Sequence, residues 1–294
     1  MKMSAGPPRI FDTLAYRARR ERAARLTGDI FLAREAAEHL AERLVAINRR
    51  FVRGLDIHSR AEIFETLRPF AQEWVRTGFA WDNPSVIADD QALPFSGGSF
   101  DLVTSALSLH AVNDLPGTLV QIRRALKPDG LFVAALFGGE TLRELRLSFA
   151  AAEAEILDGV SPRVSPFGDV RDLGGLLSRA GFALPVADVE RTTVRYRDIA
   201  RLFTDLRAHG ETNALAERSN RLLSHRLLEG VVREYKARFT DSDGRFIATF
   251  DIVFLTGWAP HESQQKPLQP GSAKIRLADA LGTKEQPTGE KPKR

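Results

Sequence analysis

Hydrogen-bonding side chains recur in this sequence at the points where apolar segments end. Asp56 closes the run FVRGLDI, three aspartates occupy positions 82–90, and the segment SALSLH at 105–110 follows another apolar run. A fourth such point is the turn at Phe137-Gly138-Gly139. In an open sheet of parallel strands, ligands bind outside the carboxyl ends of the strands. The four places therefore predict one cleft, on which Asp56 and Asp89 converge.

Several other chemistries lack the residues that they need. The chain contains no cysteine, which excludes disulfides, a nucleophilic thiol and thiolate-ligated metals. No G-x-S-x-G elbow of a serine hydrolase is present. His261 and Glu262 stand side by side, but two further ligands at metal spacing are missing, so we predict no metal site.

The order of the elements predicts an α/β fold. FVRGLDI followed by AEIFETLRPF gives the strand, turn and helix of a βαβ unit. The continuous apolar run LFVAALF is typical of a strand buried on both faces of a parallel sheet. We therefore predict a doubly wound, mostly parallel, Rossmann-like sheet. Further helices are predicted at about 9–26, 30–50, 198–208, 212–219 and 222–240.

The predicted domain plan has three parts. Residues 1–50 form N-terminal helices that pack on the core, and residues 51–262 form the α/β domain. A helical insertion at about 197–240 provides a C-terminal cap. Residues 263–294 are rich in Pro, Gly, Gln and Lys, so we expect a polar tail with a disordered end, and residues 1–8 are expected to be disordered too.

Charge and hydropathy restrict the partners. The net charge is +4 over 294 residues, and the final TKEQPTGEKPKR supplies +2 of it from four basic and two acidic residues. The body is thus nearly neutral, and nucleic-acid binding is not predicted. No run of 18 apolar residues or signal-peptide pattern occurs, so we expect no transmembrane segment, no export and a cytoplasmic location.

One stretch, RARRERAAR at 17–25, is densely basic. Apolar residues at roughly helical spacing predict a helix that docks on the body and leaves the arginines as a solvated face. These apolar residues are Ile10, Phe11, Leu14, Ala18 and Leu26. The alternative is a basic surface for an acidic partner or for peripheral contact with anionic lipid headgroups.

The segment Val86–Leu136 carries a specific resemblance. It contains D-x-x-x-LPF, an SFD strand start, an LH strand exit and a LKPDG turn in that order. It resembles the type 11 branch of class I S-adenosylmethionine-dependent methyltransferases. The resemblance implies a transferase with the Rossmann-like fold and with S-adenosyl-L-methionine as cofactor.

The resemblance also implies roles for single residues. Asp89 matches the carboxylate that accepts a hydrogen bond from the adenine amino group, and Asp90 stands where a backbone amide meets the ring. Ser105, Leu107 and His110 match positions that line the methionine and acceptor side, and His110 is a weak candidate for a catalytic base.

In the same alignment, GLDIHSRAE matches the family's glycine-rich loop, with Asp56 near the methionine ammonium. The ribose hydroxyls call for an acidic residue about 20 positions later. Glu73 lies 17 positions after Asp56 and Asp82 lies 26 positions after it, so neither matches this spacing closely, and Asp82 is taken as the candidate. The loop glycines fall at His58, Arg60 and Glu62. Left-handed backbone there would cost a non-glycine residue roughly 1–2 kcal/mol, so either cofactor binding is weakened or the loop is rebuilt.

The C-terminal half contains VSPRVSPFGDVRDLGGLLSRAGFALPVAD, DLRAHGETNAL and TGWAPHESQQKPLQPGSAKIRLADAL. With these segments it resembles bacterial relatives of a mitochondrial complex I assembly factor that has a methyltransferase fold and is associated with arginine hydroxylation. The resemblance implies a protein substrate or a respiratory-complex subunit as partner. Three functions remain open: a methyltransferase, a hydroxylase-type assembly factor, and a non-catalytic assembly factor. The polar segments GETNAL at 210–215 and HESQQKP at 261–267 either line the acceptor pocket, contact a protein substrate or cap turns.

Overall fold

The computed structural model describes residues 9–26, 28–79, 83–219, 222–265, 279 and 281–283. The chain divides into two compact units, Met1–Pro260 and His261–Arg294. Most of the predicted tail and the first eight residues lie outside the described residues. None of the described helices is long and apolar enough to span a membrane.

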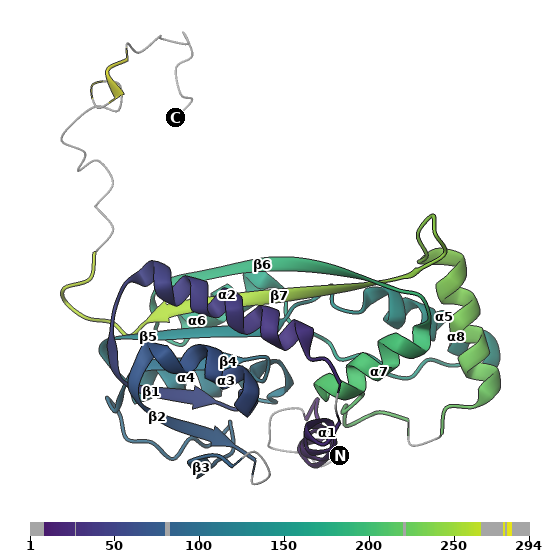
Figure 1. Ribbon diagram of the computed structural model, residues 1–294, viewed down its shortest axis with the longest axis horizontal. Helices are drawn as coiled ribbons and strands as arrows, with labels where there is room; N and C mark the ends of the chain where they lie inside the picture. The colour runs from purple at the N-terminus through teal and green to yellow at the C-terminus, as the bar shows by residue number, and fades with distance from the viewer. Residues whose placement is uncertain are drawn as a thin grey trace, which may run out of the picture. The chain divides into compact units, whose positions relative to one another are not determined.

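A twisted sheet forms the centre of the first unit (Figure 1). In the described part of the chain its strand order is β3-β2-β1-β4-β5-β7-β6. β7 runs antiparallel to β5 and β6, and the other neighbouring pairs are parallel. The predicted doubly wound, mostly parallel sheet is confirmed. The strands are β1 (Phe51–Ile57), β2 (Ala71–Gly78), β3 (Val86–Ile87), β4 (Phe100–Ala106), β5 (Leu126–Phe137), β6 (Ala183–Tyr196) and β7 (Phe246–Trp258).

Helices cover both faces of the sheet. One apolar cluster joins the sheet to α2 (Phe31–Ile47), α3 (Ala61–Leu67), α5 (Arg143–Leu157), α7 (Ile199–His209) and α8 (His225–Arg238). The other joins it to α4 (Leu115–Ala125) and α6 (Val170–Arg179). Apolar side chains of α2 recur at helical spacing, so that Leu32, Ala36 and Leu40 all become buried. In Figure 1, α2 crosses one face of the sheet and α6 lies behind it.

Helix α1 (Thr13–Ala24) lies beside the carboxyl edge of the sheet but presents a different face from the predicted one. Leu14, expected inside, is 74% exposed, and Ile10 and Leu26 are also exposed. The buried residues of the helix are Tyr16, Arg20 and Ala23. The prediction was wrong because it treated every arginine as a surface residue, whereas Arg20 finds acceptors inside the fold.

The helix predicted at 212–219 does not form. The described residues 211–219 are an irregular segment instead. The Asn213 side chain accepts a hydrogen bond from the Leu215 amide at 3.0 Å, a local turn that competes with helix formation. Leu215 then forms a β-bridge with Phe11. This bridge ties the segment to the chain just before α1.

Candidate functional site

Asp56 ends β1 and is fully buried. Its Oδ1 accepts hydrogen bonds from Ser59 Oγ at 2.6 Å and from Thr104 Oγ1 at 3.0 Å. Among the described residues, no donor reaches its other oxygen, Oδ2. Burial raises the pKa of this carboxyl to about 6, although the hydrogen bonds and the nearby Arg76 oppose the shift. The tip of β1 therefore carries a carboxylate with unused hydrogen-bonding capacity.

The loop after β1 is rebuilt rather than strained at three positions. Only His58 adopts left-handed backbone, with φ +55°. Arg60 precedes α3 with φ −60°, and Glu62 lies inside that helix. Arg60 and Glu62 form an ion pair of 2.7 Å, which compensates the negative charge of Glu62. Of the three glycine positions, the expected backbone penalty therefore applies to His58 alone.

Asp89 and Asp90 lie across from this loop. His58 Nε2 is 3.1 Å from the Ala88 carbonyl oxygen and 3.2 Å from Asp90 Oδ1, and its ring meets Phe79 edge-on. Burial raises the pKa of the Asp90 carboxyl. His58, Phe79 and Asp89 line a cavity of about 230 Å³, which we call the Asp89 cavity. Asp56 is not among the residues that line it.

Arg20 of α1 occupies the centre of this edge and is only 5% exposed. Its guanidinium donates hydrogen bonds of 3.3 Å to the carbonyl oxygens of His58 and Leu107. Leu107, like His58, has left-handed backbone, with φ +50°. Arg20 therefore holds both strained strand exits together, those of β1 and β4. The void left around it is only about 10 Å³.

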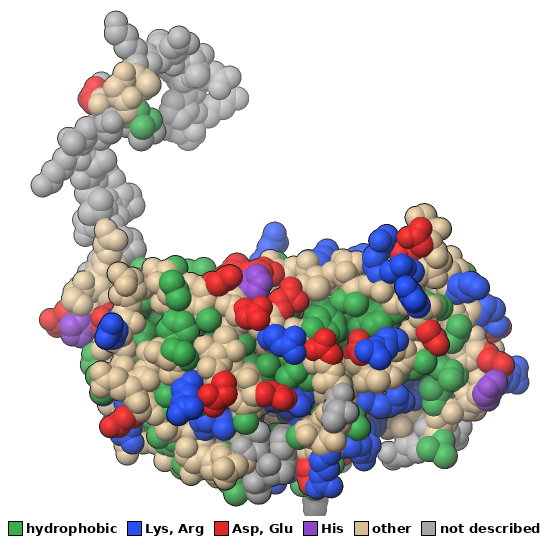
Figure 2. All heavy atoms as spheres, viewed as in Figure 1, with side chains coloured by type: hydrophobic (Ala, Val, Ile, Leu, Met, Phe, Trp, Pro, Cys, Tyr) green, Lys and Arg blue, Asp and Glu red, His purple; other side chains and the backbone are tan. Residues whose placement is uncertain are grey.

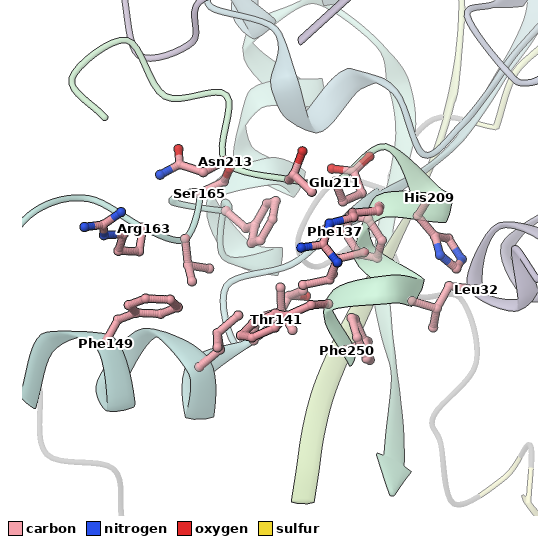
Figure 3. A pocket seen from close by; sticks show the side chains of 18 of the residues that line it. Leu32, Phe137, Thr141, Phe149, Arg163, Ser165, His209, Glu211, Asn213 and Phe250 are labelled. Atoms are coloured by element: carbon pink, nitrogen blue, oxygen red, sulfur yellow. The ribbon is translucent and has the colours of Figure 1, made fainter. Parts of the chain in front are cut away.

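A second cavity, of about 220 Å³, shares Phe137, His209 and Glu211 with the small void around Arg20 (Figure 3). We call it the aromatic pocket, because five phenylalanines line it: Phe137, Phe149, Phe167, Phe203 and Phe250. The segment 211–213 of GETNAL also lines it. Asn213 caps a local turn as well, since its Oδ1 accepts a hydrogen bond of 3.0 Å from the Leu215 amide, and its side chain donates a hydrogen bond of 2.8 Å to the Pro162 carbonyl oxygen.

Glu211 is the carboxylate of the aromatic pocket. It also lines the small void around Arg20, so it lies where the two spaces meet. Its Oε2 is 3.1 Å from His110 Nε2, and its Oε1 is 3.8 Å from Arg20 Nη1. Burial alone would raise the pKa of this carboxyl, but His110 and Arg20 bring it below its ordinary value. Glu211 is therefore ionised at neutral pH.

The structure thus divides the predicted residues into separate groups. Ser105 hydrogen-bonds to the Ile57 carbonyl oxygen and to Ser108, which ties β4 to β1. Leu107 contributes its carbonyl oxygen to Arg20, and His110 faces Glu211. Asp82 lies outside the described residues. No group of three or more metal-ligating side chains gathers among the residues that the structure describes.

Two residues that the sequence did not single out join these groups. Arg20 links the exits of β1 and β4 to Glu211, and Glu211 belongs to the GETNAL segment without having been named. A signal was present for Arg20, because Tyr16, Arg20 and Ala23 share one helical face. For Glu211, the only signal in the sequence is the polar GETNAL segment to which it belongs.

The fold and these cavities define a class of protein. The strand order, with β7 reversed between β5 and β6, and two cavities near the carboxyl ends of β1, β4 and β5 define the fold of class I S-adenosylmethionine-dependent methyltransferases. A family model described as a methyltransferase domain matches residues 61–134. The match begins just after the rebuilt loop.

Relatives and solved structures agree with this class. Human arginine-hydroxylase NDUFAF5, mitochondrial, is 39% identical over 286 residues, which are 92% of this chain and 83% of the human protein. Malonyl-[acyl-carrier protein] O-methyltransferase of Halorhodospira halophila is 34% identical over 261 residues, 83% of this chain and 86% of that protein. The YcgJ protein of Bacillus subtilis, at 13% identity, shares the fold with a TM-score of 0.53 over 76% of this chain and 99% of its own. The chain belongs to the NDUFAF5 family of methyltransferase-fold proteins.

S-adenosylmethionine is the cofactor of this class, and the residues present fit one part of it. The Asp89 cavity offers carboxylates beside the rings of Tyr16 and Phe79, a setting that suits a planar base with an amino group. Towards β4, the small void around Arg20 leaves no comparable room. The adenosyl part therefore fits, while a methionine part that extended towards β4 would meet the Arg20 side chain.

Glycine at position 58 is expected to raise the affinity for S-adenosylmethionine. Glycine adopts φ +55° freely, and loss of the imidazole ring enlarges the Asp89 cavity. The relief of about 1 kcal/mol of backbone strain partly offsets the lost ring contacts. The matched variant Glu62→Gly is expected to lower stability by about 1 kcal/mol, because Glu62 is helical, and to leave affinity unchanged. Isothermal titration and thermal unfolding measure both effects, and an equal gain in affinity for Glu62→Gly would contradict this account of the loop.

Proposed function

We propose that the protein is an enzyme that binds S-adenosylmethionine and modifies an arginine side chain of a partner protein. The observation that carries the proposal is the ionised Glu211 carboxylate at the inner end of the aromatic pocket. A guanidinium pairs with a carboxylate through paired hydrogen bonds, and its plane and stem pack well on aromatic rings. The relatives named arginine hydroxylases support the choice of arginine.

The side chains of this chain would act mainly by positioning. Glu211 would align the guanidinium, and His110 would fix the orientation of the carboxylate through its contact with Oε2. The phenylalanines of the pocket would exclude water from the reacting groups. Asp89 and its cavity would hold the adenosyl part of the cofactor, which supplies an electrophilic methyl group when bound.

Two reactions on arginine are candidates. Methyl transfer is favoured because the fold is that of methyltransferases. Hydroxylation is the second candidate, because members of the family with 38–39% identity are named arginine hydroxylases. It would need molecular oxygen and a two-electron reductant as co-reactants. We further propose a respiratory-complex subunit as the acceptor and the cytoplasm as the location, whereas the NDUFAF5 relatives are named mitochondrial.

The test is a binding comparison with two small probes. With S-adenosylmethionine present, N-acetyl-arginine amide should bind and N-acetyl-citrulline amide, which lacks the charge, should not. Glu211→Gln should weaken arginine binding about 10–100-fold, the effect of one lost charge-assisted contact. Glu217→Gln, an exposed change six residues further on, should have no effect.

Equal binding of the arginine and citrulline probes would contradict the proposal. Mass spectrometry of an arginine-containing acceptor protein after incubation then separates the two reactions, because one adds a methyl group and the other an oxygen atom. If the arginine probe binds but neither product forms, the protein is a non-catalytic assembly factor.

A further inference from the structure

Five arginines surround another cavity, of about 480 Å³, next to the aromatic pocket. We call it the arginine-lined cavity. Its described lining contains no acidic and no apolar side chain: Arg19, Arg22, Arg163, Arg207, Thr212, Asn213, Arg218 and Ser219. Figure 2 shows basic side chains gathered over the region where Figure 1 places α1 and α7. The chain therefore builds a concave surface of one sign of charge.

Most of this charge has no counterpart within the described residues. Arg163 pairs with Glu153 at 2.6 Å, and Arg218 pairs with Asp12 at 2.9 Å. In the described part of the chain, no ion pair occupies the side chains of Arg19, Arg22 or Arg207. Burial lowers the pKa of Arg19, and the positive charges of Arg218 and Arg22 lower it further. Like charges are thus held together, an arrangement that a bound anion would stabilise.

The position of the arginine-lined cavity connects it to the proposed acceptor site. Arg163, Arg207 and the pair Thr212-Asn213 line both this cavity and the aromatic pocket. The shared side chains therefore lie between a group bound in the arginine-lined cavity and a group bound in the aromatic pocket. A peptide segment whose arginine enters the aromatic pocket would bring its neighbouring residues to the arginines.

We propose that the arginine-lined cavity binds acidic side chains of the acceptor segment and so selects an arginine with Asp or Glu close to it in the acceptor. The inference rests on the proposed function, since it assigns the aromatic pocket to the acceptor arginine. A peptide is favoured over a membrane for two reasons. The cavity is recessed, and no apolar side chain lines it, whereas helices that bind membranes combine basic residues with an apolar insertion.

The experiment uses four labelled nonapeptides on the full chain. The central residue is arginine or citrulline, and the flanking residues are Asp and Glu or the corresponding amides, Asn and Gln. Fluorescence anisotropy gives the Kd of each. We expect acidic flanks to tighten binding at least tenfold at moderate salt, with the difference shrinking as salt rises. The double variant Arg22→Gln/Arg207→Gln should abolish the preference, because both side chains are exposed and line the cavity.

The matched control is Arg171→Gln/Arg179→Gln, which removes the same charge from exposed positions on α6. It should keep the preference, and circular dichroism should show both double variants folded. Equal binding of acidic and amide peptides overturns the inference. An acidic preference that survives in Arg22→Gln/Arg207→Gln also overturns it. A third contrary outcome is that the peptides do not bind, while phosphatidylserine vesicles bind in a way that depends on these arginines.

The four peptides also separate the two proposals. If acidic flanks strengthen binding but arginine and citrulline bind alike, the arginine-lined cavity stands as an anion site and the proposed function fails. If arginine is preferred and the flanks make no difference, the proposed function stands and this inference fails.

Discussion

Alanine in place of Arg20 is expected to destabilise the protein and to raise its affinity for S-adenosylmethionine at the same time. The variant leaves the carbonyl oxygens of His58 and Leu107 without their donor, and it removes the cation beside Glu211. Loss of one partner in such a buried arrangement costs about 3 kcal/mol. For a chain of this size, that corresponds to a fall in Tm of roughly 5–10 °C.

The gain in affinity follows from the space that the side chain fills. Arg20 contacts His58, which lines the Asp89 cavity, and Glu211, which lines the aromatic pocket, and the void around it is only about 10 Å³. Removal of the side chain is expected to enlarge this void, so that a cofactor extending from the Asp89 cavity no longer has to displace a buried guanidinium. Isothermal titration and thermal unfolding report the two effects.

Two further variants test the explanation. Arg25→Ala, at the exposed end of α1, should change neither stability nor affinity. Gly210→Ala should act like a mild version of the Arg20 change, since Gly210 has φ +81° and an added Cβ would lie 2.9 Å from Arg20 Cδ. If Arg20→Ala loses stability but binds the cofactor no better, the arginine is a structural tie and not a barrier to binding.

Local sequence signals predicted the sheet well because each strand and helix of this fold carries its own pattern. The segment from Val86 to Leu136 became β3, β4, α4 and β5 in the expected order. Asp114 also begins α4 as an N-cap, with its side chain accepting a hydrogen bond from the Gly117 amide at 2.9 Å. Such features depend on neighbours in the sequence, and a single sequence contains them.

The site was harder to predict because it depends on contacts between distant segments. The rings of the aromatic pocket come from positions between 137 and 250, and tertiary packing alone brings them together. Arg20 was assigned to a surface because hydropathy treats a guanidinium as exposed, whereas two strained backbone turns offer it their carbonyl oxygens. Alignment with a glycine-rich loop likewise left open whether three positions are strained or the loop is rebuilt. Because α3 begins at Ala61, only His58 is strained.

Asparagine in place of Asp56 is expected to stabilise the protein at neutral pH but not at pH 4. The ordinary pKa of this carboxyl is 3.8, and burial raises it to about 6 in the fold. Between these values the folded state binds the proton more readily than the unfolded state does, so the free energy of unfolding falls as the pH rises. A shift of this size corresponds to about 3 kcal/mol, lost in full above pH 6. Asparagine avoids this loss because it never ionises, while its Oδ1 still accepts from Ser59 and Thr104.

Urea unfolding of both proteins from pH 4 to pH 8 measures the difference, with Asp101→Asn as a control of opposite sign. Asp101 is partly buried, but hydrogen bonds from Lys127 and the Arg53 amide outweigh that burial and lower its pKa below 3.8, so its stabilising contribution is already present above pH 4 and asparagine there should destabilise the protein throughout this pH range. An advantage of Asp56→Asn that stays constant with pH would show that Asp56 does not titrate in this window. If it does, a cationic group of the cofactor near β1 should lower the pKa of Asp56 and move the window to lower pH, because an adjacent positive charge favours the ionised carboxylate.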